Sequence, residues 1–525
     1  VIKNFKDVPI LSVSLQSTLW NKTGNWRYLR PSYITLQAPC ANACPLHQDI
    51  SFYLTALADG KPGEAWQKML DANPFPSICG RVCHHPCEVD CNRKDYDEAL
   101  AIHSLERFLG DWGMKKGKDR RRGDWGMKKG KDRRRKTERK NKAAVAVIGS
   151  GPAGLACAYF LAREGHPVKV FEAMPKPGGM LRYGIPAYRL PKKILDKEID
   201  RIQSLGVEIQ TQKKLGVNLS WEDVKSFAAL FLATGAHGEQ IPGIPGRDLQ
   251  GSLAGLAFLK EINAGKKIPL AQKVVVIGGG NTAIDSARTA RRQGCQVTVL
   301  YRRAKEDMPA IAEEVEEAGK EGVHFIFHAQ PIGVQGKKGN VQAIECLKMR
   351  LADGRIAIDG WGRTNIPGIF AGGDAATGEG YVSLAIASGK RTAQAIIRYL
   401  CGEKADPGEE KPEVVRFEKI NLDYFPGKVR VKSPVLDVAN RAQGVQEVYG
   451  GLTGRRAKEE AGRCFSCGNC IRCNVCLMVC PDVAIAVKDQ DNGYCIDYDH
   501  CKGCGICVVE CPRSAMALEE EKWSK

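Results

Sequence analysis

The sequence contains no apolar run that approaches the roughly 18 residues of a membrane-spanning helix. It also lacks an N-terminal stretch with the charged and apolar regions of a secretory signal peptide. We therefore expect a cytoplasmic protein without a membrane span. With 525 residues, of which 43% are hydrophobic, the chain is long enough for about three or four domains, each with its own core.

Cysteine, in contrast, is abundant, with 21 residues, and two runs near the C-terminus share one spacing. They are Cys470-x-x-Cys473-x-x-Cys476-x-x-x-Cys480-Pro481 and Cys501-x-x-Cys504-x-x-Cys507-x-x-x-Cys511-Pro512. This is the signature of a ferredoxin with two [4Fe–4S] clusters, in which three cysteines of a run bind one cluster and the fourth binds the other. In a chain of this length such spacings favour metal ligands over disulfides.

The net charge of +18 suggests nucleic-acid binding at first sight, but much of it lies in one segment. Residues 110–140 hold 15 Lys and Arg against 5 Asp and Glu. Each all-cysteine cluster would also add about −2, because four thiolates outweigh the charge of its core. We therefore expect no nucleic-acid partner. Within the basic segment GDWGMKKGKDRRR at 110–122 recurs unchanged at 123–135, and we assign this repeat no function beyond a solvated connector.

A dinucleotide fingerprint begins with the apolar run 144–148, which predicts a buried parallel strand. Gly149-x-Gly151-x-x-Gly154 follows at once, then a helical stretch to about Glu164 and a second strand that ends before Glu172. The glycines allow a tight turn and close approach to a pyrophosphate at the helix N-terminus, and the acidic residue accepts from a ribose hydroxyl.

A second fingerprint has its strand at 273–277, Gly278-x-Gly280-x-x-Ala283 at the turn and another strand at 296–300. Here the acidic residue is absent, and Tyr301-Arg302-Arg303 stands in its place. Two guanidinium groups suit the 2′-phosphate of NADPH better than a bare ribose diol, so we favour NADPH over NADH. The alternative is that these arginines only coat the surface.

Two fingerprints indicate two dinucleotides, and three short glycine-containing pieces fit a flavin domain around the first. They are Gly178-Gly179-Met180, Ala233-Thr234-Gly235 and Phe370-Ala371-Gly372-Gly373-Asp374.

The chain resembles the small subunit of bacterial glutamate synthase and its relatives, which include the N-terminal half of dihydropyrimidine dehydrogenase. The motifs that carry this resemblance span roughly residues 37–400: CGRVCHHPCEVDC at 79–91, GGMLRYGIPAYRLP at 178–191, GGGNTAIDSARTARRQG at 278–294 and AGGDAATG at 371–378. The resemblance implies FAD on the first Rossmann unit, NADPH on the second and iron–sulfur clusters in a helical N-terminal domain. For FAD we expect the residues Gly149, Gly151, Gly154, Glu172, Gly179, Arg182, Thr234, Gly373 and Asp374. For NADPH we expect Gly278, Gly280, Asn281, Thr282, Ala283, Arg302 and Arg303.

The chain departs from the family between residues 350 and 361, where relatives have several dozen more residues and a strand that completes the NADPH domain. Either the protein has lost that strand or the sequence has a gap. We favour a gap, since the shortened sheet would expose an edge.

The N-terminal cysteines that match the family number six, whereas two clusters need eight ligands, and no cysteine precedes Cys40. Cys464 and Cys467 resemble a pair that relatives carry near the N-terminus. We hypothesise that this pair joins Cys40 and Cys91 in one cluster; the alternatives are a separate site or spare thiols beside the ferredoxin. By the same resemblance, the other cluster would use Cys44, Cys83, Cys87 and Glu106, with Cys79 as the competitor for the last position. With the eight cysteines of the tail this makes four [4Fe–4S] clusters. Cys157, Cys295, Cys346, Cys401 and Cys495 remain, and we expect them to be small core residues.

The expected function is an NAD(P)H-dependent flavoprotein subunit that converts between hydride and single-electron transfer. NADPH would reduce FAD, and electrons would pass through the clusters to the ferredoxin tail; no catalytic side chain is expected. The partner would be a soluble ferredoxin or a larger redox subunit, of the 2-oxoacid:ferredoxin oxidoreductase or sulfite reductase type. Alternatives are the glutamate synthase small subunit itself, an electron-bifurcating subunit and a non-enzymatic electron relay.

The predicted fold class is α/β, with two Rossmann-like domains between a helical iron–sulfur domain and an α+β ferredoxin domain. The predicted segments are an N-terminal extension at 1–36, the helical domain at 37–109, a basic linker at 110–142, the FAD domain at 143–255 and 361–400, the NADPH domain at 256–360, a second linker at 401–460 and the ferredoxin domain at 461–525.

Overall fold

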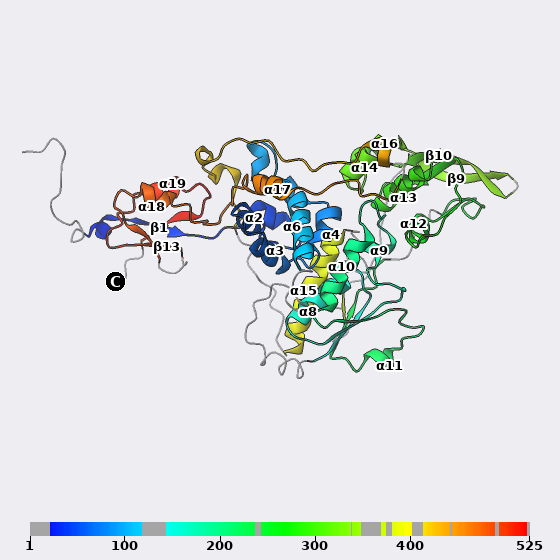
Figure 1. Cartoon of the computed structure of the whole chain (residues 1–525), viewed down its shortest axis with the longest axis horizontal. Coiled ribbons are helices and arrows are strands. Elements are labelled where there is room, and N and C mark those ends of the chain that lie inside the picture. Colours follow the sequence, from blue (N-terminus) through cyan, green and yellow to red (C-terminus); the bar gives the residue numbers. More distant parts are fainter. Residues whose placement is uncertain are drawn as a thin grey trace, which may run out of the picture.

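The computed structural model describes residues 22–117, 143–236, 243–337, 339–347, 369–373, 381–401, 413–441, 444–488 and 493–521. The ferredoxin end of the chain lies at one end of the molecule, the helical domain lies at its centre, and the two nucleotide-binding domains lie beyond it (Figure 1). In the described part, no helix has the length and apolar character to cross a membrane.

The helical domain is built from short helices, several of which begin at a proline, a residue suited to the first helical turn. Its elements are α1 (Pro39–Ala43), α2 (Ile50–Ala58), α3 (Pro62–Leu70), α4 (Pro76–Val82), α5 (Pro86–Val89), η3 (Asn92–Asp95) and α6 (Ile102–Gly117). Helix α6 runs eight residues into the segment predicted as a basic linker. Those residues are packed there, since Met114 is buried and Asp111 forms an ion pair with Arg81. The second copy of the repeat lies outside the described residues.

The FAD domain is a five-stranded parallel sheet in the order β11-β5-β2-β3-β4. Its strands are β2 (Val145–Ile148), β3 (Val168–Phe171), β4 (Glu208–Gln210), β5 (Ala229–Leu232) and β11 (Ile369–Ala371). Its helices are α8 (Pro152–Arg163), α9 (Met180–Tyr183), α10 (Lys192–Gln203), α11 (Trp221–Val224) and α15 (Val382–Leu400). Strand β2 is buried on both faces, as expected for a central parallel strand.

The NADPH domain has a three-stranded parallel sheet in the order β6-β7-β8 and a separate antiparallel hairpin. Its elements are α12 (Gly255–Asn263), β6 (Lys273–Ile277), α13 (Asn281–Arg292), β7 (Gln296–Leu300), η4 (Lys305–Asp307), α14 (Ala312–Lys320), β8 (His324–Ile326), β9 (Gln330–Lys337) and β10 (Asn340–Leu347). Among the described strands β6 pairs only with β7, and Val275 at its centre is 44% exposed. Residues 348–368, where the predicted gap falls, lie outside the described part.

The elements that follow residue 413 pack against several earlier parts of the chain. They are η6 (Phe417–Lys419), η7 (Leu422–Tyr424), α16 (Val438–Arg441), α17 (Gly454–Ala461), α18 (Val475–Val479), β12 (Ile485–Val487), β13 (Tyr494–Ile496), α19 (Ile506–Val509) and β14 (Met516–Glu520). Helix α16 lies beside α14 of the NADPH domain, and α17 packs on α2 and α6 (Figure 1). The segment predicted as a linker therefore makes buried contacts with two domains.

The N-terminal segment, predicted to be a separate extension, contains η2 (Thr23–Trp26) and β1 (Leu29–Tyr33). Strand β1 pairs antiparallel with β14. We call residues 22–33 and 468–521 together the ferredoxin module.

Candidate redox site

The first glycine fingerprint forms the turn between β2 and α8, and it borders a cavity of about 800 Å³. Gly149 has a φ of +103°, and a Cβ added there would lie 2.2 Å from the Ala233 carbonyl oxygen. A Cβ at Gly151 would meet no protein atom within 4 Å, so this position opens onto the cavity. Gly280 of the second fingerprint has the same open surroundings. Both turns therefore leave the space that a pyrophosphate requires beside a helix N-terminus.

Glu172 lines the same cavity and is nearly buried. Its carboxylate accepts hydrogen bonds from the backbone N–H groups of Ser150, at 2.9 Å, and Met174, at 2.7 Å. These bonds hold the carboxylate at the end of β3, where a ribose hydroxyl could reach it.

Of the other residues predicted to bind FAD, some line the cavity and others do not. Gly179, Thr234 and Gly373 line the cavity. Arg182 instead lies outside the lining, since its guanidinium donates to Asp196 and to the Pro177 carbonyl oxygen, each at 2.5 Å. Asp374 lies outside the described residues.

The N-terminus of α13, in the second fingerprint, faces the same cavity. Asn281 and Thr282 line it, and the Asn281 side chain accepts a hydrogen bond from the backbone N–H of Ile311 at 3.0 Å. Gly278 has a φ of +127° at the turn, and Ala283 lies in the first turn of the helix. One cavity therefore borders both fingerprints, so that a nicotinamide and a flavin could meet there. Arg302 and Arg303 follow β7, are half-buried and form no ion pair with a described residue.

The sequence did not indicate a buried ion pair that joins the two nucleotide domains. Arg189 of the FAD domain donates to both oxygens of Asp285, at 2.9 and 2.8 Å, and its Nε lies 3.1 Å from Glu314. Asp285 is four residues beyond Asn281, on the same face of α13. That spacing is the one local signal that could have pointed to it.

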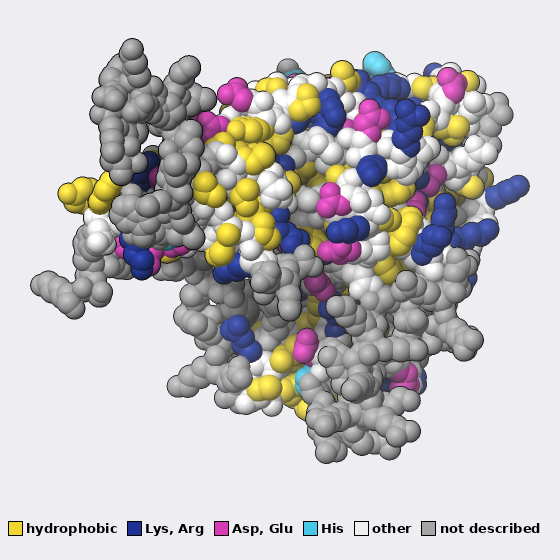
Figure 2. Space-filling model, turned by 60° about the vertical axis from the view of Figure 1, so that its left-hand side comes forward, with side chains coloured by type: hydrophobic (Ala, Val, Ile, Leu, Met, Phe, Trp, Pro, Cys, Tyr) yellow, Lys and Arg dark blue, Asp and Glu magenta, His cyan; other side chains and the backbone are white. Residues whose placement is uncertain are grey.

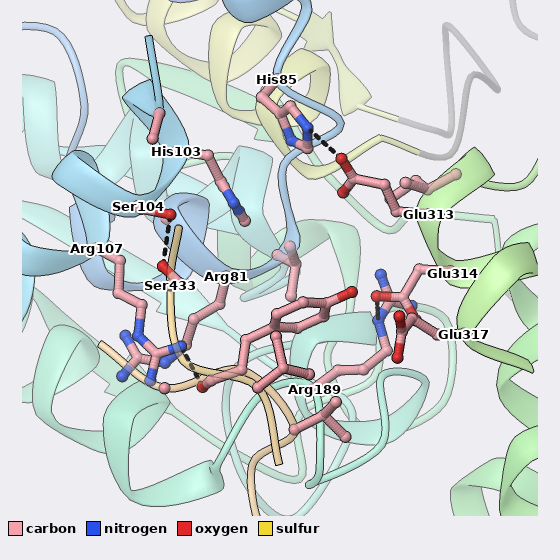
Figure 3. Close-up of a pocket in the computed structure, with 18 of the residues that line it drawn as sticks. Arg81, His85, His103, Ser104, Arg107, Arg189, Glu313, Glu314, Glu317 and Ser433 are labelled. Carbon is pink, nitrogen blue, oxygen red and sulfur yellow. Dashed lines mark hydrogen bonds and ion pairs between the residues drawn. The ribbon is translucent and has the colours of Figure 1, made fainter. Parts of the chain in front are cut away.

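A smaller cavity of about 340 Å³ lies between the helical domain, α14 and the segment near residue 433 (Figure 3). Its charged side chains are largely paired within the protein. His85 contacts Glu313 at 3.3 Å, and the Ser433 hydroxyl donates to Ser104 at 2.8 Å. These contacts stabilise the packing of the NADPH domain against the helical domain.

Four cysteines that we call the first set, Cys40, Cys91, Cys464 and Cys467, come together near α1 and the end of α17. Burial raises the pKa of Cys40 well above its usual range, and the thiols of the other three raise it further. Burial likewise raises the pKa of Cys467 to about 12. A raised pKa means that each buried thiol keeps its proton when no cation is near, and iron, which binds thiolate, would take the place of that proton.

The second set consists of Cys44, Cys83, Cys87 and Glu106. Glu106 is 5% exposed, and its Oε1 accepts from the side-chain amides of Gln48, at 2.9 Å, and Asn73, at 2.6 Å. Burial raises the pKa of Cys83 to about 12, and the Glu106 carboxylate contributes to that rise. Cys79 is also close, since Glu106 and Cys83 both raise the pKa of its buried thiol. The structure therefore keeps both candidates for the fourth ligand near the other three.

Two further cavities in the ferredoxin module are each lined by four cysteines. One is lined by Cys470, Cys473, Cys476 and Cys511, and the other by Cys480, Cys501, Cys504 and Cys507. In each, the fourth cysteine comes from the other run, as the spacing predicts. Among the described residues no three His, Cys, Asp or Glu side chains meet around a single metal ion. Of the remaining cysteines Cys157 and Cys295 are buried, but Cys401 is exposed, so the core assignment is wrong for that residue.

Three family models match the chain. They are pyridine nucleotide-disulphide oxidoreductase at residues 143–346, dihydropyrimidine dehydrogenase domain II with its 4Fe-4S cluster at 34–118, and 4Fe-4S binding domain at 494–517. Among curated proteins, NADP(+)-dependent formate dehydrogenase subunit beta of Moorella thermoacetica is 35% identical, over 82% of this chain and 70% of the relative. The NADPH-Fe(3+) oxidoreductase subunit beta of Geobacter sulfurreducens is 34% identical, over 82% and 75%. The glutamate synthase [NADPH] small chain of Escherichia coli is 30% identical, over 69% and 88%.

The chain belongs to the family of glutamate synthase small chain-like NADPH oxidoreductases. The resemblance and the fold class predicted from the sequence are confirmed. As a member of this family it is an NADPH-dependent oxidoreductase with FAD and [4Fe–4S] clusters as cofactors. FAD would lie in the 800 Å³ cavity, whose open glycine turn fits a dinucleotide, and the clusters would be held by the sets of cysteines described above.

Proposed function

We propose that the chain is the NADPH-binding beta subunit of a larger redox enzyme, and that it exchanges electrons between NADPH and a partner through its ferredoxin module. When bound, FAD converts a hydride into single electrons, and each cluster carries one electron at a time. The protein contributes the positions of these groups and the shielding of the 800 Å³ cavity from water.

The observation that carries the proposal is that the 800 Å³ cavity, which we call the flavin cavity, adjoins the second set of cluster ligands. Val82 lines the cavity, and the next residue is Cys83. On the other side Tyr381, which also lines the cavity, stacks on His84 with ring centroids 4.1 Å apart. Tyr381, the residue just before α15, thus touches both the cavity and the loop that carries Cys83. This arrangement supports electron transfer directly from the flavin to the second set.

The contacts of the first set support a continuous path into the ferredoxin module. Cys467 lies three residues before Cys470, the first cysteine of the module. The chain between them is fixed, because the Leu36 N–H donates to the Gly468 carbonyl at 3.2 Å and the Asn469 amide donates to the Ser51 hydroxyl at 2.7 Å. We therefore propose four clusters in one rigid series, with the ferredoxin module as its outer end.

The surface of the module supports a protein partner. Val483 is 81% exposed, Val509 72% and Met478 70%, and Cys504 and Cys473, five residues before Val509 and Met478, are also exposed. Apolar side chains are visible among charged ones on this side of the molecule (Figure 2). Exposed apolar side chains around an electron-transfer site are a common feature of docking surfaces. The two beta-subunit relatives belong to multi-subunit enzymes by name, and we propose that this chain also binds a larger catalytic subunit.

Anaerobic addition of NADPH to the purified holoprotein tests the proposal. The flavin absorbance should bleach first, and EPR signals of reduced clusters should follow. In a Cys83→Ser variant that keeps its FAD, bleaching should persist while cluster reduction slows. If the clusters were reduced without flavin bleaching, or if the flavin did not respond to NADPH, the proposal would be overturned. The chain would then act as an electron relay that does not use NADPH. Co-purification from the native source then identifies the partner.

A further inference from the structure

Strand β1 belongs to the ferredoxin module although it comes from the opposite end of the chain (Figure 1). Its pairing with β14 places Tyr33 opposite Met516, which is buried. The Gly24 N–H donates to the Asp499 carbonyl at 2.8 Å, and the Tyr498 hydroxyl donates to the Pro31 carbonyl at 2.8 Å. These bonds fix the register of β1 over the cysteine-lined cavities.

Alternate residues of a strand point to the same face, and β1 reaches both cavities with one residue each. Pro31 lines the cavity of Cys480, Cys501, Cys504 and Cys507. Tyr33 lines the cavity of Cys470, Cys473, Cys476 and Cys511. The two contacts differ chemically, because proline offers only an apolar ring and tyrosine offers a hydroxyl.

The Tyr33 hydroxyl lies 3.2 Å from the sulfur of Cys476. Its ring is held in place by Tyr494, on which it stacks with centroids 6.0 Å apart and planes at 21°. A phenol, with an ordinary pKa of about 10, is protonated at neutral pH, whereas a cysteine bound to iron is a thiolate. With a cluster in place, therefore, Tyr33 is the donor and Cys476 the acceptor.

We propose that Tyr33 sets the reduction potential of the cluster bound through Cys476. Hydrogen bonds to the sulfurs are among the factors that determine cluster potentials. Reduction adds one negative charge, and a fixed donor stabilises the more negative state, so the hydroxyl raises the potential. The other cluster of the module has Pro31 in the equivalent place and receives no such bond from β1. This inference rests on the proposed cluster ligands.

Tyr33→Phe tests the inference, because it removes the hydroxyl and keeps the ring. Tyr494→Phe is the matched control, since the Tyr494 hydroxyl donates to the Asn474 side chain at 2.5 Å and not to a sulfur. The holoproteins would be titrated anaerobically and followed by EPR. In Tyr33→Phe one cluster should bind its electron roughly tenfold more weakly, a fall of about 59 mV for a one-electron couple. The other clusters, and all clusters of Tyr494→Phe, should keep their potentials.

The possible failures can be told apart. Unchanged potentials in Tyr33→Phe at full iron content would overturn the role of Tyr33 and leave the cluster ligands standing. Equal shifts in both variants would reveal a packing effect and would also overturn it. A wild-type protein without the cluster signals of the module would instead overturn the proposed function. Flavin bleaching by NADPH should be the same in all three proteins, because neither tyrosine borders the flavin cavity.

Discussion

The side-chain amide of Asn92 donates a hydrogen bond of 3.6 Å to the sulfur of Cys467, a residue 375 positions further along the chain. The same amide also donates to the Val415 carbonyl oxygen at 3.3 Å. Asn92 directly follows Cys91, so the bond joins the N-terminal and C-terminal members of the first set. It also means that a donor is already aimed at a sulfur that would carry negative charge when it binds iron.

Loss of the C-terminal pair should therefore remove one cluster. We expect Cys464→Ser/Cys467→Ser to lower the iron content from about 16 to about 12 atoms per chain, since an all-cysteine cluster depends on its thiolates. Chemical iron analysis after anaerobic purification measures this. Cys401→Ser/Cys495→Ser is the matched control, because neither thiol belongs to a set, and it should keep full iron. An unchanged iron content in the first variant would contradict the shared cluster.

The two arginines after β7 should select NADPH. In Arg302→Ala/Arg303→Ala we expect the KM for NADPH to rise roughly 10- to 100-fold, because a hydrogen bond to a charged group contributes about 1.5–3 kcal/mol. The KM for NADH should change little, since NADH has no 2′-phosphate. Steady-state assays with an artificial acceptor measure both constants. Arg247→Ala, at an exposed arginine that pairs with Asp248, serves as the control, and equal losses with both nucleotides would argue against a phosphate site.

Gly149 should be required for FAD binding. Gly149→Ala places a Cβ 2.2 Å from the Ala233 carbonyl oxygen, at a φ of +103°. The turn must therefore shift, and we expect the purified variant to lose most of its FAD, measured as the ratio of flavin to protein absorbance. Gly206→Ala has a similar φ of +96° but meets no atom within 4 Å, so it controls for backbone strain alone. Equal FAD contents in the two variants would refute a steric role at the turn.

Lys192 should make the stability of the protein depend on pH. Its pKa is lowered to about 7, mainly by burial and also by the nearby Arg182, while Asp285 and Asp196 oppose the shift. The unfolded chain binds a proton at this lysine up to a pH of about 10.5, whereas the folded chain releases it near pH 7. Since the unfolded state then holds more protons, stability rises with pH between these values.

A Lys192→Met variant lacks this contribution. The melting temperature of the wild type relative to the variant should therefore increase from pH 7 to pH 10, and the difference should be constant below pH 7. Scanning calorimetry of the apoprotein across this range measures it. A difference that stays the same across the whole range would mean that the lysine is not perturbed.

Local patterns in the sequence predicted the elements around the fingerprints closely. The strands expected at 273–277 and 296–300 coincide with β6 and β7, and the first strand differs from β2 by one residue. These elements depend on short apolar runs and on glycine turns, which act over a few neighbouring residues. Within each ligand set proposed from spacing and resemblance, the members lie near one another in the structure. Their metal content remains a prediction.

The sequence by itself determined that two dinucleotide turns and a doubled cysteine spacing are present, because each is encoded in one short stretch: residues 144–172, 273–303 and 470–511. Only the tertiary structure decided what surrounds them. Tyr33 meets Cys476, Asn92 meets Cys467 and Arg189 meets Asp285 through pairs that are far apart in the chain. Such contacts depend on which distant segments pack against one another and which strand edges pair. No local pattern specifies this packing and pairing. The link between Cys464 and Cys467 and the N-terminal cysteines was a hypothesis from resemblance, whereas the pairing of β1 with β14 emerged only in three dimensions.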